Sequence, residues 1–372
     1  MKIKNILKPV AVLSASAVLV SAAGCADTSW SFKTSNKTLT NGGWIYYTYT
    51  ATNEAMQKIE EDTEKSVDLA TDDLTSKKVE KKNAVDWINS EAKKNVVAQL
   101  TVEKLVKDNK VKLDNDYIDS TKKQYISYIE QYGTDFYNTL GVSTETIADI
   151  SIVYPYKSEQ LFKHIYDKDG TKEVSDKEVK KYFTDNYTDY YYIPYSFKTT
   201  DEEGNSTDID DETKDKVTAA FAKYVKELNS GDKTPSDIDE EYKTDFEVET
   251  SAGVADTVNF EDSTMNEDLQ KAIKALKEKK AAVKEIDDTY YLIYKGSISE
   301  KAEKISDDES DDDAVSRIDL VHAIKDDEYQ KYLEAEQKKL KYETNDDCLS
   351  KYTVERTINI LADQAKSQSS DS

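Results

Sequence analysis

The chain has 372 residues, of which 34% are charged and 37% hydrophobic, and its net charge at pH 7 is −24. This length allows two or more domains with a sizeable core. The excess of carboxylates argues against a nucleic-acid partner, because phosphate binding needs local positive charge. An acidic surface instead suits a soluble body beside an anionic membrane or wall, and it favours basic clients. The 26 tyrosines suit a binding surface or, equally well, helix cores.

Residues 1–24 have the pattern of a secretion signal. Lysines near the start precede an apolar run over residues 9–20 and four small residues that end at Gly24. Small residues directly before Cys25 resemble a bacterial lipobox, although Ala22 stands where leucine is usual. The resemblance implies a lipid on Cys25 that anchors the chain to the outer face of the bacterial cytoplasmic membrane. Ordinary signal cleavage with an incidental Cys25 is the alternative.

The next part of the chain has the apolar spacing of helices. Residues 25–40 are expected to form a tether and a first strand, and Asn41-Gly42-Gly43 to form a turn. Gly133 and Gly141 are expected to end two of the helices as C′ glycines. The predicted helices cover residues 44–63, 84–109, 115–132 (capped by Asp114), 135–140 and 144–166 (interrupted by Pro155).

Residues 173–198 join two kinds of structure. Ser175 and Glu178 form an S-x-x-E capping box, and Val174 and Val179 occupy the two positions of a hydrophobic staple. A helix is therefore expected to begin here. The aromatic and β-branched residues that follow, 190–198, predict a strand. Pro194 inside it indicates an edge strand or a bulge.

The segment 190–298 is predicted to be one small α+β domain in the order β-α-α-β-α-β. The expected strands are 190–198, 246–250 and 289–295, and the expected helices are 213–229, 236–243 and 265–277. Beyond it, the acidic run 306–313 could bind calcium, but it lacks the spacing of a calcium loop and is interpreted as a solvated linker. Two further helices are expected at residues 318–341 and 347–366, before a polar tail.

Few residues in the chain carry obvious chemistry. If Cys25 is lipidated, Cys348 has no disulfide partner and is expected to be a buried small apolar residue. His164 and His322 fall in helical patterns, as surface or half-buried residues. Two histidines and one free cysteine cannot form a zinc cage. The sequence has no G-x-S-x-G, H-E-x-x-H or P-loop motif. We therefore expect no metal and no cofactor.

Several runs in order resemble the PrsA/SurA-type extracytoplasmic foldases. The strand, turn and aromatic helix of residues 32–49 match the start of that family's helical lobe. The run Y-G-T-D-F-Y-N-T-L-G at 132–141 and the run V-S-D-K-E-V-K-K-Y-F at 174–183 follow. Segment 190–297 takes the place of the family's parvulin prolyl-isomerase domain. Within it, residues 263–286 resemble the parvulin helix that has an L-x-x-A-x-x-x-L core, here Leu269, Ala272, Ile273 and Leu276.

The resemblance implies a multidomain α and α+β protein. A helical chaperone lobe would be built from the N- and C-terminal segments, with a small parvulin-like α+β domain inserted between them. The expected parts are the signal (1–24), tether and first strand (25–40), N-terminal helical region (41–172), connecting helix (173–189), parvulin-like domain (190–298), acidic linker (299–314), returning C-terminal helices (315–366) and polar tail (367–372).

The sequence departs from the family at the catalytic histidines. Parvulins carry one histidine in the first strand and one in the last, and the matching positions here hold Tyr195 and Tyr291. The glycine-rich parvulin run is reduced to residues 251–254. A diverged isomerase pocket would have to use Tyr195, Phe197, Met265 and Tyr291. The chain is therefore expected to lack the usual catalytic pair, although imide rotation breaks no covalent bond and could proceed in an apolar pocket.

The leading functional hypothesis is a membrane-anchored chaperone that binds unfolded secreted polypeptides in a tyrosine-rich cleft of its helical lobe. The candidate contact residues are Trp44, Tyr46, Tyr47, Tyr49, Tyr125, Tyr128 and Phe136, each of which also fits a helix core. An active prolyl isomerase is the first alternative. A solute-binding lipoprotein is the second, and it ranks lower because such proteins usually need two lobes with several parallel strands. A homodimer is left open.

Overall fold

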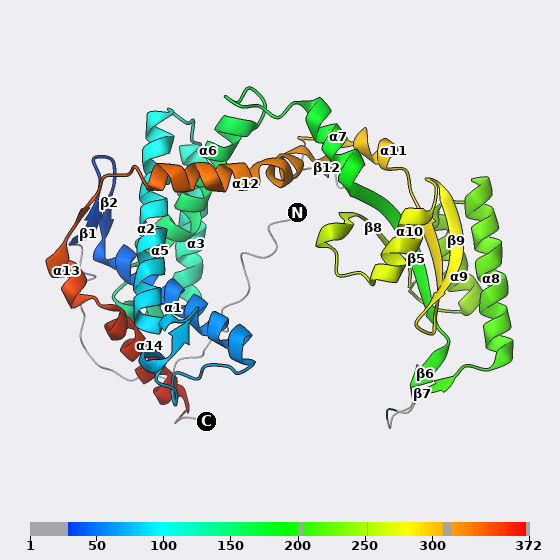
Figure 1. Ribbon diagram of the computed structural model, residues 1–372, viewed down its shortest axis with the longest axis horizontal. Helices are drawn as coiled ribbons and strands as arrows, with labels where there is room; N and C mark the ends of the chain where they lie inside the picture. The colour runs from blue at the N-terminus through cyan, green and yellow to red at the C-terminus, as the bar shows by residue number, and fades with distance from the viewer. Residues whose placement is uncertain (1–28, 201–203, 205, 251, 308–313, 370–372) are drawn as a thin grey trace. The chain divides into compact units, whose positions relative to one another are not determined.

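The computed structural model describes residues 29–200, 204, 206–250, 252–307 and 314–369 (Figure 1). The predicted signal segment, residues 1–24, and Cys25 lie outside these residues, as do positions 308–313 of the acidic run. The chain forms two compact units. The helical unit comprises Met1–Glu173 and Lys325–Ser372, and the sheet unit comprises Val174–Ile324. The protein is thus α-helical in one part and α+β in the other.

The helical unit begins with a small sheet that joins the two ends of the chain. Strands β1 (Trp30–Lys33) and β2 (Thr38–Thr40) form a hairpin, and β13 (Glu343–Thr344) adds to the other side of β1. In β1, Phe32 lies opposite Leu39 on one side and Thr344 on the other. The hairpin leads directly into the first helix.

The predicted turn at Asn41-Gly42-Gly43 is wrong, because these residues form the first turn of helix α1 (Asn41–Thr63). Thr40 is the N-cap, and its side chain accepts a hydrogen bond from the backbone N–H of Gly43. Gly43 is needed for space, since a Cβ there would lie 2.5 Å from the Leu39 side chain. The glycines therefore permit close packing of the hairpin on the helix.

Further helical segments follow α1 and largely match the predicted pattern. The N-caps Asp114 and Ser143 accept hydrogen bonds from the backbone at Tyr117 and Thr146, and Gly141 ends a helix at φ +82°. A π-helical turn, η2, precedes Pro155 and keeps the last segment continuous. The segments are α2 (Ala84–Asp108), α3 (Asn115–Tyr132), α4 (Thr134–Leu140), α5 (Thr144–Ala148), η2 (Asp149–Val153) and α6 (Tyr154–Tyr166).

The C-terminal residues complete the helical unit. Helix α12 (Arg317–Gln337) contains the division between the two units. The helix predicted over 347–366 is two helices, α13 (Asp346–Lys351) and α14 (Val354–Ser369). They part at Tyr352, whose backbone carbonyl accepts a 2.7 Å hydrogen bond from the Trp44 indole. Val354 and Ile358 of α14 pack in the core formed by α1 and α2.

The short elements between α1 and α2 also belong to this unit. A 3₁₀ turn, η1 (Leu74–Ser76), precedes a hairpin of β3 (Lys78–Val79) and β4 (Lys82–Asn83). Leu74 and Val79 are buried against the same core as α1.

The sheet unit contains a four-stranded antiparallel sheet in the order β8-β5-β10-β9. Its strands are β5 (Tyr187–Ser196), β8 (Val254–Asn259), β9 (Lys280–Ile286) and β10 (Thr289–Lys295). Strand β5 is internal, contrary to the expected edge. However, its pairing with β8 ends at Tyr192, so at Pro194 only β10 lies alongside it. A proline is tolerated there because one side of the strand has no neighbour.

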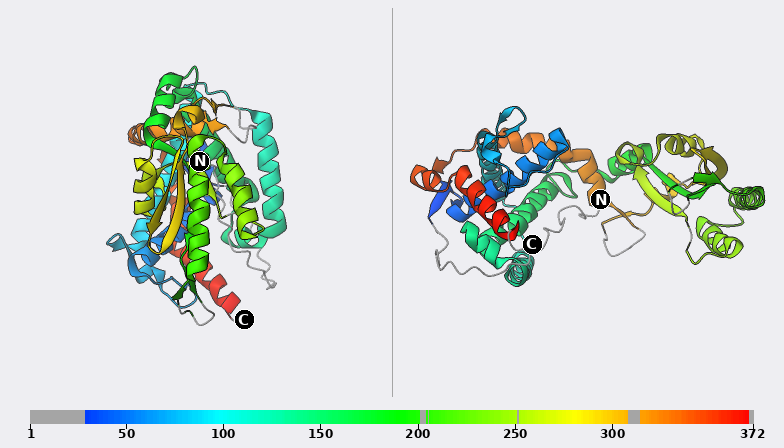
Figure 2. Two further views of the ribbon diagram at one scale, coloured as in Figure 1. Left: turned by 90° about the vertical axis from the view of Figure 1, so that its right-hand side faces the viewer. Right: turned by 90° about the horizontal axis from the view of Figure 1, so that it is seen from below.

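Helices cover both faces of this sheet. Helix α8 (Asp211–Ser230) and α9 (Pro235–Phe246) pack on one face, and α10 (Glu267–Ala275) packs on the other. The left view of Figure 2 shows the strands edge-on between them. Side chains alternate along each strand, as a pleated sheet requires. Thus Tyr191 and Ile193 face α8, whereas Tyr190 and Ile293 face α10.

One strand prediction in this unit is wrong, and strands β8 and β9 were not predicted. Residues 246–250 form no strand, because Phe246 ends α9 and packs its ring 5.7 Å from that of Tyr195. Conversely, Lys280–Ile286 forms strand β9, although its sequence resembled the end of a helix. The expected strands 190–198 and 289–295 are present as β5, displaced by two to three residues, and β10.

The entry and exit of the sheet unit lie beside each other. Helix α7 (Asp176–Asn186) starts with the predicted capping box of Ser175 and Glu178. The buried guanidinium of Arg317, at the start of α12, donates to the Asp176 carboxylate at 2.8 Å and to the Val174 carbonyl at 2.7 Å. Helix α11 (Ile298–Ala302) and the parallel pair of β11 (Ile305–Ser306) and β12 (Val315–Ser316) lie near these residues. Strands β6 (Lys198–Thr200) and β7 (Ser206–Asp208) form a separate hairpin.

Candidate functional site

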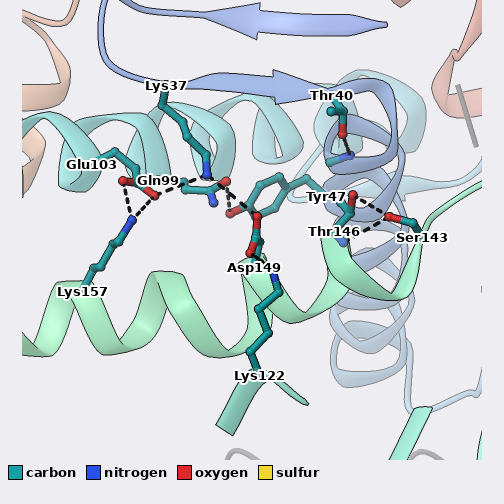
Figure 3. Close-up of polar contacts among 11 residues, drawn as sticks. Lys37, Thr40, Tyr47, Gln99, Glu103, Lys122, Ser143, Thr146, Asp149 and Lys157 are labelled. Atoms are coloured by element: carbon teal, nitrogen blue, oxygen red, sulfur yellow. Dashed lines mark hydrogen bonds and ion pairs between the residues drawn. The ribbon is translucent and has the colours of Figure 1, made fainter. Parts of the chain in front are cut away.

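Two of the predicted client-binding residues belong to the core of the helical unit. Trp44 is 2% exposed and donates its indole N–H to the Tyr352 carbonyl. Tyr47 is 5% exposed, and its hydroxyl donates to Oε1 of the buried Gln99 at 3.1 Å (Figure 3). Both side chains join α1 to neighbouring segments, so neither offers surface to a client. Their aromatic character serves packing.

Four other predicted residues meet in one place, together with one tyrosine that the prediction missed. They come from α1, α3 and α4 and are half-buried over a small core that contains Ile45, Ile129 and Leu361. We call this set the aromatic cluster; its members are Tyr46, Tyr49, Tyr125, Phe136 and Tyr137. Partial burial leaves part of each of these residues accessible to solvent.

Ring contacts link the four members of the aromatic cluster that lie on α1 and α4. Tyr49 and Phe136 meet edge to face with centroids 5.2 Å apart, and Phe136 meets Tyr137 in the same way at 5.0 Å. Tyr46 lies 6.1 Å from Tyr49 and 6.3 Å from Tyr137. Such pairs stabilise by about 0.5–1.5 kcal/mol each beyond the burial of their area. The cluster is therefore a packed apolar surface of definite shape.

The positions of these rings follow from the local sequence. Tyr46 and Tyr49 are three residues apart, so they share one face of α1. Phe136 and Tyr137 lie on the short helix α4, which ends at Gly141 in the left-handed conformation. The glycine turns the chain so that the buried Val142 and Ile147 return to the same core. The prediction missed Tyr137, although the spacing of Phe136 and Tyr137 from Leu140 indicates that all three side chains lie on one face of a helix.

Burial governs the electrostatics of the aromatic cluster. Desolvation raises the pKa of the phenols of Tyr46, Tyr49 and Tyr137 above the usual 10. The Tyr46 hydroxyl also lies 3.0 Å from the Ser151 hydroxyl on the π-helical turn, a contact that partly offsets its pKa shift. All three phenols are thus neutral at physiological pH. The surface combines apolar rings with uncharged hydroxyls, a chemistry suited to binding varied polypeptides.

The seventh candidate, Tyr128, lies outside the aromatic cluster. It is 57% exposed on α3 and pairs with Tyr132, which is 53% exposed, at a centroid distance of 5.1 Å. Tyr117, also on α3, is 51% exposed and lies 5.1 Å from Tyr156. The tyrosines of this helix are therefore only partly covered. Tyr117, Tyr132 and Tyr156 were not among the predicted contact residues.

A chain of ion pairs connects the first hairpin to helices of the helical unit (Figure 3). Glu103 of α2 binds Lys157 of α6 at 2.7 Å and Lys37 of the first hairpin at 3.8 Å. Asp149, at the start of the π-helical turn, binds Lys37 at 3.9 Å and Lys122 of α3 at 2.6 Å. Alternating charges thus connect five elements. We assign this chain of ion pairs a structural role, because each charge faces an opposite one.

The four candidate residues of an isomerase pocket are not brought together. Tyr195 and Phe197 belong to the core against α8 and α9, whereas Tyr291 and Met265 belong to the core against α10. The register explains the separation: Tyr195 lies opposite Tyr290, and Tyr291 lies opposite Pro194. Residues one position out of step in an antiparallel pair point to opposite faces.

The β5 tyrosine that contacts Tyr291 is Tyr192. Their rings meet at 66° with centroids 5.9 Å apart, as diagonal neighbours on the α10 face. Tyr192 is three positions before the tyrosine that the motif comparison had selected. Burial raises the pKa of the Tyr192 phenol, with Tyr291 adding to the shift. A tyrosine pair, rather than a histidine pair, thus joins the two central strands on this face.

The other chemically notable residues have ordinary surroundings. His164 and His322 are half-buried on α6 and α12, as predicted. Cys348 is buried beside the Asn41 side chain. Over the part of the chain that the structure describes, no three His, Cys, Asp or Glu side chains are placed to hold a metal ion. Within those same residues, no helix is both long and apolar enough to cross a bilayer.

Three solved structures overlay on the chain. Foldase protein PrsA from Streptococcus pneumoniae is 19% identical, with coverage of 66% of this chain and 83% of its own and a TM-score of 0.28. PrsA from Lactococcus lactis is 12% identical, covering 87% and 99%, with a TM-score of 0.31. PrsA from Bacillus subtilis is 16% identical, covering 74% and 93%, with a TM-score of 0.28. TM-scores of this size assign neither a fold family nor an activity.

No protein-family model and no curated protein matches the sequence. The functional conclusion therefore depends on the residues themselves.

Proposed function

We propose that the protein is a chaperone that binds unfolded secreted polypeptides on the aromatic cluster of its helical unit. The observation that carries the proposal is the convergence of five half-buried rings from α1, α3 and α4. Their accessible sides provide apolar contact, and their neutral hydroxyls can exchange hydrogen bonds with main-chain groups. Broad specificity for unfolded chains needs this combination, because such clients share a backbone and scattered apolar side chains.

The location belongs to the same proposal. A lipid on Cys25 would anchor the protein outside the bacterial cytoplasmic membrane, where newly exported chains emerge unfolded. The sequence pattern of residues 9–25 supports this placement. Mass spectrometry of the membrane fraction tests it, since a lipidated Cys25 adds the mass of its acyl chains and a Cys25→Ser chain does not.

Prolyl isomerisation is the alternative function. Tyr192 and Tyr291 are the only aromatic pair in contact between the described residues of β5 and β10 on the α10 face, but neither is a histidine. The division of Tyr195 and Phe197 from Met265 and Tyr291 argues against a pocket made from those four. We therefore propose binding without isomerase catalysis. Solute binding ranks lower, because parallel pairing among the described strands is confined to β11 and β12.

The deciding experiment compares two assays on the same purified protein. Light scattering of a reduced, aggregating client measures holding, and the rate of a proline-limited refolding reaction measures isomerisation. We expect aggregation to be suppressed and the refolding rate to remain at its spontaneous value. Acceleration of refolding would favour the isomerase, and absence of both effects would overturn the chaperone proposal.

Two substitutions connect the activity to the aromatic cluster. Tyr49→Ser and Phe136→Ser should each raise the protein concentration needed for half-suppression about threefold, the equivalent of losing one aromatic contact of about 0.7 kcal/mol. Tyr342→Ser is the matched control, since this ring is 42% exposed but lies outside the cluster. Equal losses in all three variants would show that exposed aromatic rings act without regard to position.

A further inference from the structure

Strand β8 is an open edge of the sheet. It pairs with β5 along residues 187–192, and no strand among the described residues lies on its other side. Its first three residues, 254–256, are exposed, and the Val254 side chain is 39% exposed. Alternate backbone groups of an edge strand point away from its neighbour. Among the loop and cap hydrogen bonds described, none uses a backbone carbonyl of β8, and its one extra N–H bond goes from Thr257 to the adjacent Asp256 carboxylate.

The opposite edge of the same sheet is guarded at Ala281. The side-chain amide of Asn229, at the end of α8, donates to the Ala281 carbonyl at 3.0 Å and accepts from the Ala281 N–H at 2.9 Å. It thereby makes the two bonds that an added strand would make at that residue of β9. Lys280 adds a further bond to the Asn229 carbonyl. Proteins commonly protect edge strands in such ways, so the lack of a comparable guard along β8 distinguishes the two edges.

The open edge lies within a strongly acidic part of the chain. Residues 244–270 contain eight Asp and Glu and no Lys, Arg or His. Asp256 is exposed in the middle of β8, and Glu261 and Asp262 are exposed just beyond its end. Burial raises the pKa of the Tyr182 phenol on the neighbouring α7, and the Asp262 and Glu261 carboxylates add to that shift. The edge therefore combines unpaired main-chain groups with concentrated negative charge.

We propose that β8 binds an extended basic polypeptide segment, which adds to the sheet as a fifth strand. Main-chain hydrogen bonds to β8 would provide affinity for any extended segment. Asp256 and the carboxylates beyond the strand would select lysine and arginine side chains. This site is separate from the aromatic cluster and goes beyond the chaperone function proposed for it.

A second copy of the chain fits this edge less well. Two β8 strands side by side would bring their Asp256 carboxylates together, and each chain carries a net charge of −24. Like charges opposite each other destabilise paired strands. A basic segment meets neither penalty, so charge complementarity favours it as the occupant.

Three peptides test the proposal by fluorescence anisotropy at low salt. The first is an eight-residue peptide that alternates lysine and valine, and the second alternates glutamate and valine. The third repeats the first with N-methyl groups on four successive residues, which removes donors from both edges of the peptide strand. We expect the first peptide to bind, the second to bind at least about tenfold more weakly because of charge repulsion, and the third to lose binding.

Two charge reversals on the same sheet form a matched pair. Asp256→Lys on β8 should weaken the lysine–valine peptide about tenfold. Glu285→Lys, at an exposed position on the guarded strand β9, should leave its affinity within about twofold of the original. Thermal unfolding of both variants checks that the sheet remains folded. Backbone hydrogen exchange supplies the second readout, and the lysine–valine peptide should slow exchange in residues 254–259.

Several results would overturn the proposal. These are equal binding of the N-methylated peptide, equal effects of the two charge reversals, and unchanged exchange in β8. Self-association that Asp256→Lys alters, without peptide binding, would replace the peptide with a second copy. The Tyr49→Ser and Phe136→Ser proteins should bind the lysine–valine peptide normally, so failure of the aromatic-cluster proposal and failure of this one give different results.

Discussion

Asn229 pairs with Ala281 as a strand would, giving and receiving one hydrogen bond through its side-chain amide at 3.0 and 2.9 Å. Asn229→Ala should therefore lower the free energy of unfolding by about 1–2 kcal/mol, at about 0.5–1.5 kcal/mol for each bond. Asn229→Asp retains the acceptor and should lose about half as much. Urea unfolding of the two variants measures the difference. If Asn229→Ala lost less unfolding free energy than Asn229→Asp, this account of the β9 edge would be contradicted.

Trp44 and Phe136 should separate stability from binding. Trp44→Ala removes a buried ring and should cost about 3–5 kcal/mol of unfolding free energy. Phe136→Ala should cost about 1–2 kcal/mol, because the ring is half-exposed. Yet only Phe136→Ala should weaken client holding per folded molecule. Denaturant unfolding measures the stability of both variants, and the aggregation assay, corrected for the folded fraction, measures their client holding. Trp44→Ala should be the less stable variant, and Phe136→Ala should be the weaker at holding clients.

The buried pair of Tyr47 and Gln99 gives a third prediction. Tyr47→Phe leaves the Gln99 amide oxygen without its donor at a site that is 1% exposed. The expected cost is about 1–3 kcal/mol. Adding Gln99→Leu to Tyr47→Phe should recover part of that loss, because no buried polar atom then lacks a partner. A double-mutant cycle in urea measures the recovery, and simple additivity of the two losses would argue against direct coupling.

The capping box of α7 predicts a local effect in the sheet unit. Ser175→Ala removes the acceptor for the Glu178 N–H and should destabilise the protein by about 1 kcal/mol. Ser236→Ala, at an exposed serine in the first turn of α9, is the control and should change stability by less than about 0.5 kcal/mol. Hydrogen exchange in α7 should rise with the first substitution alone.

Glu328 links stability to pH in the acid range. Hydrogen bonds from Lys325 at 2.8 Å and Lys172 at 3.0 Å lower the pKa of this carboxyl from 4.5 to about 2. A carboxylate with a depressed pKa stabilises the fold above its unfolded pKa, and that stability is lost as the pH falls towards about 2. Glu328 and its two lysine partners are partly exposed, so their contribution to the free energy of unfolding should be below about 1 kcal/mol.

The measurement compares urea unfolding of Glu328→Gln with that of Glu334→Gln, at an exposed position on the same helix. Between about pH 5 and pH 2, Glu328→Gln should lose less stability than the original protein does. Glu334→Gln should follow the original curve. Parallel curves for all three proteins would show that the two lysines do not hold Glu328 ionised.

Local signals predicted much of the secondary structure. The Ser175–Glu178 box and the strand Thr289–Lys295 were identified from their own residues, because cap chemistry and β-branched aromatic runs act over a few positions. Strand β9 was missed, since lysine, alanine and glutamate favour helices in isolation. Its pairing with β10 overrides that preference.

The functional sites were less accessible to sequence reasoning. Motif comparison placed Tyr195 beside Tyr291, but a difference of one position in strand register puts them on opposite faces. Helical spacing could not tell the buried Trp44 and Tyr47 from the half-buried Tyr46 and Tyr49, because that difference depends on which helices cover α1. The guard at Asn229 involves residues 52 positions apart and has no local signature.

The sheet that joins Phe32 to Thr344 also affects how the protein is made. The helical unit cannot finish its core until β13 and α14 have been synthesised, whereas every residue of the sheet unit precedes them. The sheet unit can therefore fold first. Trp44 and its neighbours remain unpacked until their partners, about 300 residues later in the chain, have been synthesised. During its own synthesis, the protein passes through an exposed, apolar state of the kind that it is proposed to protect in others.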